Sequence, residues 1–324
     1  MSDPKPPGDG EAHAELVVAR RVEVTAEVVM LELRSPERVA LSLWTVGAHI
    51  DLVLPSGRIR QYSLCGDPTD NSVYVIAVQR QETGRGGSVE VCDSIAVGQL
   101  LTVRGPRNHF PMGDSVNYLF IAGGIGITPI SAMVREVASA QRDWKLVYGG
   151  RALDQMPFLN ELVELGGDRV VPVPQDESGF PDIEALVGEV PTGTAIYCCG
   201  PSPMLAAVEL AVESLRDDVS LHIERFVAPD VAASPRLSFE VELRRSGVTV
   251  VVPPEKSILE VVLDTIGDVD FSCEQGICGA CETKILEGRP EHHDSLLSEE
   301  ERESNATMMI CVGRSKTGKL VLDL

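Results

Sequence analysis

Short runs rich in β-branched and other apolar side chains fill the chain up to about residue 103, and no helical period separates them. Turn residues stand between the runs, as in Pro55-Ser56-Gly57 and the stretch 67–71. Closely spaced strands without intervening helices predict an antiparallel barrel. The predicted strands span residues 15–24, 26–34, 48–54, 61–64, 73–79 and 99–103.

A different pattern begins near Ser115. Strand-like apolar runs now alternate with amphipathic helical stretches, and this alternation predicts a doubly wound parallel sheet. Ligands of such a sheet bind at the carboxyl ends of its strands. The predicted strands are 118–122, 145–148, 169–172 and 195–198, and the predicted helices are 129–140, 158–165, 183–187 and 203–215.

The last 88 residues follow a third pattern. A hairpin over 237–245 and 248–252 precedes a helix that Ser257 caps and that runs from Ile258 to about Ile266. A strand over 282–286, a charged helix over 298–303 and a final strand over 320–323 complete a small mixed fold. The predicted organisation is a disordered tail over 1–13, domains over 14–114 and 115–227, a linker over 228–236 and a domain over 237–324.

Composition narrows the functional classes. The chain has 324 residues and a formal charge of −21, which repels nucleic acid and anionic lipid. The acidity therefore suits either binding to basic protein surfaces or solubility alone. No run of 18 or more apolar residues predicts a membrane span, and the first ten residues lack the apolar core of a secretion signal. Cys65, Cys92, Cys198 and Cys199 show no disulfide framework, so we expect a cytoplasmic protein.

Four other cysteines form the strongest motif in the chain. Cys273, Cys278 and Cys281 have the C-x4-C-x2-C spacing, and Cys311 lies thirty residues further on. This is the spacing of plant-type 2Fe-2S ferredoxins, in which four thiolates hold the two irons. A structural zinc site more often shows two cysteine pairs, and a disulfide would suit a secreted protein. The pattern therefore favours a 2Fe-2S cluster.

The residues around these cysteines fit that interpretation. Gly276, Gly279 and Ala280 are small, so backbone N–H groups can approach the sulfur atoms of a cluster. Ser272 precedes the first cysteine and is placed to donate a further hydrogen bond. We expect a tight loop around the metal centre.

Two segments of the predicted barrel could bind a phosphate. Arg60-Gln61-Tyr62-Ser63-Leu64 supplies a fixed cation, and Gly84-Arg85-Gly86-Gly87-Ser88 precedes a short helical run over 89–95. A flavin phosphate requires a cation and a group of N–H donors at the start of a helix. Each segment alone is also compatible with an ordinary surface strand or loop.

Two turns of the parallel sheet are candidates for binding a dinucleotide. Gly124-Ile125-Gly126-Ile127-Thr128-Pro129 follows a strand and opens a helix, but it is G-x-G-x-x-P and not the usual G-x-G-x-x-G. Cys199-Gly200-Pro201 lies where another strand meets a helix. The alternative for this second segment is a tight turn with a buried thiol.

In this order, the segments together resemble the phthalate dioxygenase reductase family, the flavin and iron–sulfur reductases that serve Rieske-type oxygenases. The resemblance covers nearly the whole chain after the tail, and a ferredoxin at the C-terminus is typical of that family. It implies a multidomain fold with an antiparallel β-barrel flavin domain, an α/β doubly wound nucleotide-binding domain and a C-terminal β-grasp 2Fe-2S ferredoxin domain.

The resemblance also assigns roles to residues. It implies FMN, although the chemistry of the residues alone leaves FMN and FAD open, with NADH as the substrate that reduces it. Phe226 is similar to the aromatic residue that covers the flavin ring. The flavin, nucleotide and nicotinamide motifs match at Arg60, Tyr62, Ser63 and Leu64, at Arg85, Gly86, Gly87 and Ser88, at Gly124, Gly126 and Thr128, and at Cys199, Gly200 and Pro201.

The implied function is a relay that takes hydride from NADH and delivers single electrons through the cluster to a terminal oxygenase. No residue need act as an acid or base in the hydride step. That oxygenase is expected to act on an aromatic or similar small substrate. A haem-thiolate monooxygenase or another electron acceptor is the alternative, and a monomer is expected. Arg151 stands where an arginine could meet the 2′-phosphate of NADPH. A dihydroorotate dehydrogenase subunit would place the fourth cysteine closer, and a regulatory module without turnover would not need intact cofactor motifs.

Overall fold

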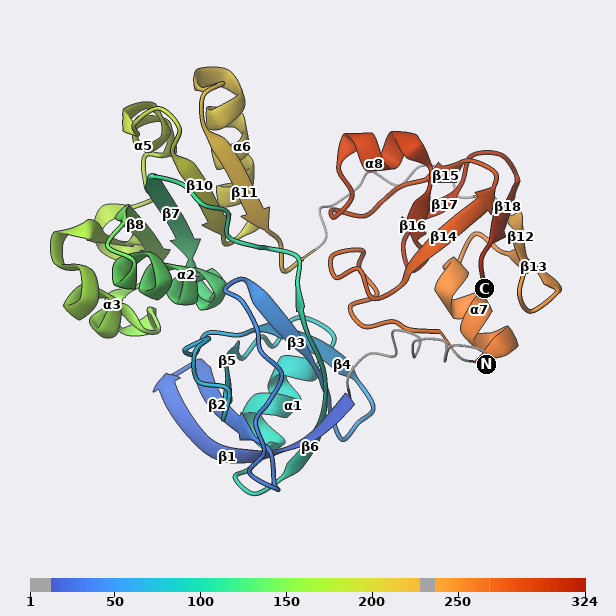
Figure 1. Ribbon diagram of the computed structural model, residues 1–324, viewed down its shortest axis with the longest axis horizontal. Helices are drawn as coiled ribbons and strands as arrows, with labels where there is room; N and C mark the ends of the chain where they lie inside the picture. The colour runs from blue at the N-terminus through green and yellow to red at the C-terminus, as the bar shows by residue number, and fades with distance from the viewer. Residues whose placement is uncertain (1–12, 228–236, 268) are drawn as a thin grey trace, which may run out of the picture. The chain divides into compact units, whose positions relative to one another are not determined.

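The computed structural model describes residues 13–227, 237–267 and 269–324. The predicted tail and linker lie outside these residues, apart from residue 13. The described chain forms two compact units, one ending at Glu224 and one beginning at Arg225. The first unit holds both the antiparallel and the parallel sheet (Figure 1).

The predicted barrel is confirmed as a six-stranded antiparallel sheet in the order β4-β3-β6-β1-β2-β5. A bridge between Leu64 and Ile76 joins the two outer strands. The apolar residues that face inward, such as Ile50, Leu52 and Leu31, are fully buried. The strands are β1 (His13–Thr25), β2 (Val28–Arg34), β3 (Ala48–Val53), β4 (Ile59–Ser63), β5 (Tyr74–Gln79) and β6 (Leu100–Asn108), with helix α1 (Gly87–Ser94) before β6.

The predicted nucleotide-binding domain has a parallel sheet in the order β11-β10-β7-β8-β9. Alternate residues of its strands face opposite layers: Phe120 packs with α2 and α3, whereas Leu119 and Ile121 pack with α5 and α6. The chain leaves the central strands β7 and β10 in opposite directions across the sheet, which creates the crevice where such folds bind ligands.

The elements of this domain are β7 (Asn117–Gly123), η1 (Gly124–Gly126), α2 (Ile127–Ser139), β8 (Asp143–Gly150), η2 (Leu153–Gln155), α3 (Leu159–Gly166), η3 (Gly167–Arg169), β9 (Val170–Pro174), α4 (Gln175–Ser178), α5 (Ile183–Glu189), β10 (Ala195–Cys199), α6 (Ser202–Leu215) and β11 (Ser220–Glu224). Strand β11 and the short helices were not predicted. The predicted strands and longer helices all appear, with ends that differ by a few residues.

The second unit contains a mixed sheet in the order β13-β12-β18-β14-β16 with α7 packed on its core. The predicted cap is confirmed, because the Ser257 hydroxyl accepts the Glu260 N–H and the Glu260 carboxylate accepts the Ser257 N–H. The elements are β12 (Phe239–Leu243), β13 (Val248–Val252), α7 (Ile258–Ile266), β14 (Glu282–Glu287), β15 (Pro290–Glu291), α8 (Glu299–Ser304), β16 (Thr307–Met309), β17 (Arg314–Ser315) and β18 (Lys319–Leu322).

Membrane-spanning segments were also sought among these elements. In the described ranges no helix combines the length and the apolar character needed to cross a bilayer.

Candidate functional site

The structure brings the two predicted flavin segments together at the start of α1. Arg60 donates from Nη2 to the Arg85 carbonyl oxygen at 2.8 Å. A Cβ placed on Gly87 would lie 2.4 Å from Nε of Arg60, so the arginine crosses directly over this glycine. Gly86 has a φ of 72° and begins the helix in the left-handed region. The cation and the N–H donors of the helix start are therefore adjacent.

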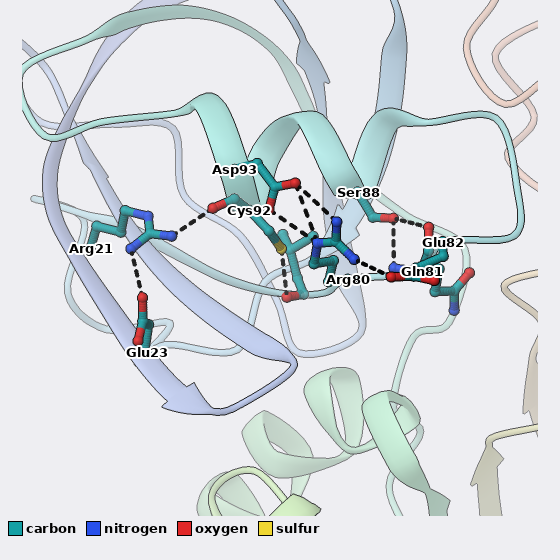
Figure 2. A network of polar contacts seen from close by, with 9 residues as sticks. Arg21, Glu23, Arg80, Gln81, Glu82, Ser88, Cys92 and Asp93 are labelled. Carbon is teal, nitrogen blue, oxygen red and sulfur yellow. Dashed lines mark hydrogen bonds and ion pairs between the residues drawn. The ribbon is translucent and has the colours of Figure 1, made fainter.

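A network of polar contacts fixes helix α1 to the barrel (Figure 2). Arg80, just after β5, makes a bidentate ion pair with Asp93 in the last turn, at 3.0 and 3.1 Å. Arg21 of β1 donates to the Cys92 carbonyl oxygen at 2.6 Å and so satisfies a free carbonyl near the helix end. The Ser88 hydroxyl accepts the Gln81 N–H at 3.1 Å. The Ser88 hydroxyl thus stabilises the loop between Gln81 and Ser88.

Strand β4 and Leu64, which directly follows it, carry the other predicted flavin residues. Leu64 is fully buried, and its N–H donates to the Ala48 carbonyl oxygen at 2.8 Å. The Tyr62 hydroxyl and Nε2 of Gln61 are buried atoms that have no hydrogen-bond partner among the described residues. Burial raises the pKa of Tyr62, so its hydroxyl remains a donor. Buried polar atoms of this kind normally have a partner, and polar atoms of a flavin fit that need.

The two turns of the parallel sheet interlock at the carboxyl ends of β7 and β10. A Cβ on Gly126 would lie 2.2 Å from the Cys199 carbonyl oxygen, and one on Gly200 would lie 3.1 Å from the Gly123 backbone. Only glycine permits this approach. Gly124 has a φ of 55°. Both turns therefore form one continuous surface at the crevice of the sheet.

Two members of these turns have roles within the fold. Thr128 is buried, and its hydroxyl donates to the Ile125 carbonyl oxygen at 3.0 Å, which stabilises the start of α2. Pro201 precedes α6, and its Cδ would meet a Cβ on Gly123 at 2.6 Å. The hydroxyl of Thr128 is thus engaged with its own turn.

Sequence reasoning missed Glu224, the last residue of β11 in the parallel sheet. Its Oε2 is 4.0 Å from Sγ of Cys199, its partner in the parallel register of β10 and β11. Burial raises the pKa of Glu224 to about 8, and a hydrogen bond from Ser63 opposes this shift. Burial and the nearby Glu224 also raise the pKa of Cys199. At neutral pH both groups are therefore protonated.

Two further residues were predicted to contact a cofactor or substrate: Arg151 the 2′-phosphate of NADPH, and Phe226 the flavin ring. Arg151 follows β8, is 72% exposed and pairs with Glu27 of the barrel at 3.6 Å. Phe226 lies in the second compact unit and is 37% exposed. Its role as a cover for the flavin stays a prediction.

The four predicted ligand cysteines are all buried and form a chain of contacts. Hydrogen bonds from the thiols of Cys278 and Cys311 lower the pKa of Cys273, and one from Cys311 lowers that of Cys281. The thiolate of Cys273 also accepts the Gln275 N–H at 3.3 Å. The four sulfur atoms therefore interact with one another, and the thiolate is the form of cysteine that binds iron.

The backbone of the loop has the shape expected of a cluster loop. Gly276 and Gly279 have φ values of 68° and 72°, which favour glycine. The Ser272 hydroxyl is buried and has no partner in the described part of the chain. In the same described residues, no three His, Cys, Asp or Glu side chains form a group that would hold a single metal ion. The donor set of four thiols fits a 2Fe-2S cluster, which spreads its ligands over two irons.

Comparison with protein families matches two parts of the chain. Residues 241–316 match the 2Fe-2S iron-sulfur cluster binding domain, and residues 120–210 match the oxidoreductase NAD-binding domain. The chain is 43% identical over 301 residues to the phenoxybenzoate dioxygenase subunit beta of Ectopseudomonas oleovorans, covering 92% of this chain and 93% of that protein. It is 38% identical to the phthalate 4,5-dioxygenase oxygenase reductase subunit of Pseudomonas putida, covering 95% and 96%.

Solved structures agree with these relatives. Phthalate dioxygenase reductase, described as a modular structure for electron transfer from pyridine nucleotides to a 2Fe-2S centre, superposes with a TM-score of 0.73 and 32% identity over 98% of both chains. The chain belongs to the phthalate dioxygenase reductase family. An intact type IV self-sufficient cytochrome P450 monooxygenase has a TM-score of 0.87 and 37% identity, but this chain spans only 41% of it. Members of the phthalate dioxygenase reductase family are oxidoreductases, so the predicted family, fold class and enzyme class are confirmed.

Proposed function

We propose that this protein is the NADH-dependent reductase component of a Rieske-type oxygenase system. The observation that carries the proposal is the meeting of Ser63 from the barrel with Glu224 and Cys199 from the parallel sheet within one compact unit. This juxtaposition of side chains from both domains supports a site at which a nicotinamide and a flavin would meet. Family membership supports the same conclusion.

The chain's residues would bind three groups. Arg60 and the N–H groups of Gly87 and Ser88 would hold the phosphate of FMN, and the Tyr62 hydroxyl would satisfy a polar atom of the flavin. Gly124, Gly126 and Thr128 would approach the NADH pyrophosphate through their backbone, with Cys199, Gly200 and Pro201 beside the nicotinamide. Cys273, Cys278, Cys281 and Cys311 would hold the cluster.

When bound, flavin and cluster together convert a two-electron hydride donor into a source of single electrons. Ser63 and Cys199 are buried and Glu224 is partly buried, so these side chains are then positioned to orient the two rings and to keep water out. Glu224, protonated below about pH 8, presents no negative charge to the leaving hydride. The partner is a terminal oxygenase, as it is for the reductase subunits that resemble this chain.

Anaerobic mixing with NADH tests the proposal. The flavin absorbance should bleach first, the cluster absorbance should then fall, and the extracted flavin should be FMN in an amount equal to the protein. NADPH should reduce the protein more slowly than NADH. FAD in place of FMN would contradict the flavin assignment, and failure of NADH to reduce the protein would contradict the proposed function.

A cytochrome P450 is the second candidate acceptor, favoured by the likeness to the reductase portion of the self-sufficient monooxygenase. Reduction of a purified haem-thiolate protein but not of a Rieske-type oxygenase would select it. We further propose a cytoplasmic monomer with domains over 14–114, 115–227 and 237–324. None of the eight cysteines, all of which are described, forms a disulfide, which is typical of reducing compartments. Light scattering tests the monomer.

A further inference from the structure

Asp294 is a buried carboxylate of the ferredoxin domain that lies outside the cysteine motif. Its side chain is 1% exposed, and its Oδ2 accepts the N–H groups of Leu296 and Leu297 at 3.2 and 2.9 Å. Nη2 of Arg302, on α8, donates to the Asp294 carbonyl oxygen at 2.5 Å and lies 3.7 Å from Oδ2. Nδ1 of His292 is 3.6 Å from Oδ1. A buried charge is tolerated only with such partners.

The turn that contains Asp294 packs against the middle of the cysteine loop. The Ser295 N–H donates to the Gly276 carbonyl oxygen at 2.9 Å. A Cβ on Gly276 would lie 3.0 Å from Cα of Asp294 and 2.6 Å from Cγ2 of Val312. Val312 directly follows the fourth predicted ligand, Cys311. Gly276 is therefore held between the Asp294 turn and the segment that carries this ligand.

We propose that Asp294 is a positioning residue for the 2Fe-2S cluster and that Arg302 connects it to the surface helix α8. This inference rests on the proposed function. The carboxylate organises the turn through two backbone N–H groups, and the turn fixes the loop between Cys273 and Cys278 by direct backbone contact. Partners behind the ligands of a metal centre orient those ligands and tune their properties in this way.

The charges of the pair should also act on the reduction potential, and in opposite senses. A cluster gains one negative charge on reduction, so a buried carboxylate nearby disfavours the reduced state and a guanidinium favours it. Removal of the Asp294 charge should therefore raise the midpoint potential, and removal of the Arg302 charge should lower it. A role in folding alone would not produce shifts of opposite sign.

The test uses Asp294→Asn and Arg302→Gln in the full-length protein loaded with flavin and cluster. The midpoint potential is measured by a redox titration followed by electron paramagnetic resonance, and cluster stability by the rate of iron loss to a chelator. Both variants should lose iron roughly 10- to 100-fold faster than the wild type. Asp323→Asn is the matched control, since Asp323 also pairs with an arginine, Arg245, at 2.6 Å but directly after β18 and outside the cysteine loop.

The control should retain the wild-type potential and rate of iron loss. Wild-type behaviour of both Asp294→Asn and Arg302→Gln would overturn the proposal, as would potential shifts of the same sign in the two. If Asp294→Asn does not fold, the comparison of Arg302→Gln with Arg302→Lys tests the proposal. Arg302→Gln removes the charge and should lower the midpoint potential, whereas Arg302→Lys keeps the charge and should not. An unchanged potential in Arg302→Gln rejects the proposal. A wild-type protein without iron would instead refute the proposed function.

Discussion

Glu224 and Cys199 face each other across two parallel strands, with 4.0 Å between the carboxyl oxygen and the thiol sulfur. The Ser63 hydroxyl approaches the same carboxyl from the barrel. Ser63 thus connects the barrel with this pair of the parallel sheet, at the site proposed for hydride transfer. The protonation of the pair should therefore be measurable both in stability and in function.

Glu224→Gln should change the pH dependence of stability. Burial raises the pKa of Glu224 from 4.5 to about 8, so the folded protein favours the neutral carboxyl. The stabilisation is fully present below about pH 4.5 and is lost as pH rises through 8. Wild type and Glu224→Gln should thus melt alike near pH 5, and the variant should melt higher above pH 8. A tenfold change in a protonation equilibrium corresponds to about 1.4 kcal/mol, so the difference in unfolding free energy should be on the order of a few kcal/mol.

Glu213→Gln on α6 is the control for that experiment, because Glu213 is exposed on the same domain. It should follow the wild type at every pH. A melting temperature of Glu224→Gln that tracks the wild type from pH 5 to 9 would show that Glu224 is ionised in the folded protein, and the hydrogen bond with Ser63 would then need another explanation.

Arg60→Ala should weaken FMN binding without weakening riboflavin binding. Charge-assisted hydrogen bonds to a phosphate contribute about 1.5 to 3 kcal/mol each, which corresponds to roughly 10- to 150-fold in affinity. Riboflavin lacks the phosphate and therefore isolates its contribution. Arg20→Ala, an exposed arginine on β1 paired with Glu32, is the matched control. Equal losses of FMN and riboflavin in Arg60→Ala would mean that Arg60 supports only the fold.

Periodicity predicted most of the fold because each element carries its own signal. The hairpin strand β13 appears at the predicted residues, and the capped helix α7 begins at Ile258 as expected. Strand β11 was missed because five residues that include a histidine and a glutamate gave too short an apolar pattern. The three residues of β16 gave none. Such strands form because neighbours in the sheet supply their hydrogen bonds, which no local pattern records.

The candidate site likewise has parts that the sequence predicted and parts that it did not. The cysteine loop was predictable because three of the four ligands have a fixed spacing within nine residues. Glu224 was not, because its importance arises from the register with Cys199 and from Ser63, which is far away in sequence. The hydroxyls of Ser88 and Thr128 matched a motif, yet each bonds to its own turn. A motif fixes the residue type but not the partner that its side chain finds.

Gly126→Ala should destabilise the first compact unit. The added methyl group would meet the Cys199 carbonyl oxygen at 2.2 Å, and neither backbone can yield without separating the two turns. Overpacking of this kind costs about 1 to 3 kcal/mol. Gly188→Ala is the control, because Gly188 lies in α5 with open space around its Cα, and it should stabilise the protein by about 0.5 to 1 kcal/mol. Thermal unfolding, monitored through the release of flavin, compares the two variants with the wild type. Equal melting temperatures of Gly126→Ala and the wild type would contradict the predicted contact.

Arg151→Ala should leave the preference for NADH over NADPH unchanged. Arg151 is exposed and pairs with Glu27, so its charge is already partly balanced. Steady-state kcat/KM with both nucleotides provides the measurement. If the wild type has a substantial kcat/KM with NADPH that the variant loses, while kcat/KM with NADH is unchanged, Arg151 contacts the 2′-phosphate and the choice of NADH was wrong.

Cys278→Ser should separate the two halves of electron transfer. Serine is a poor substitute for a thiolate ligand, so the cluster should be absent or labile, whereas the predicted flavin residues of the barrel belong to the other compact unit. Mixed with NADH, the variant should still bleach its flavin and should still reduce ferricyanide. It should fail to reduce cytochrome c or a terminal oxygenase. Cys65→Ser, a buried cysteine outside the loop, controls for thiol loss as such. Normal reduction of protein acceptors by a variant without iron would remove the ferredoxin domain from the electron path.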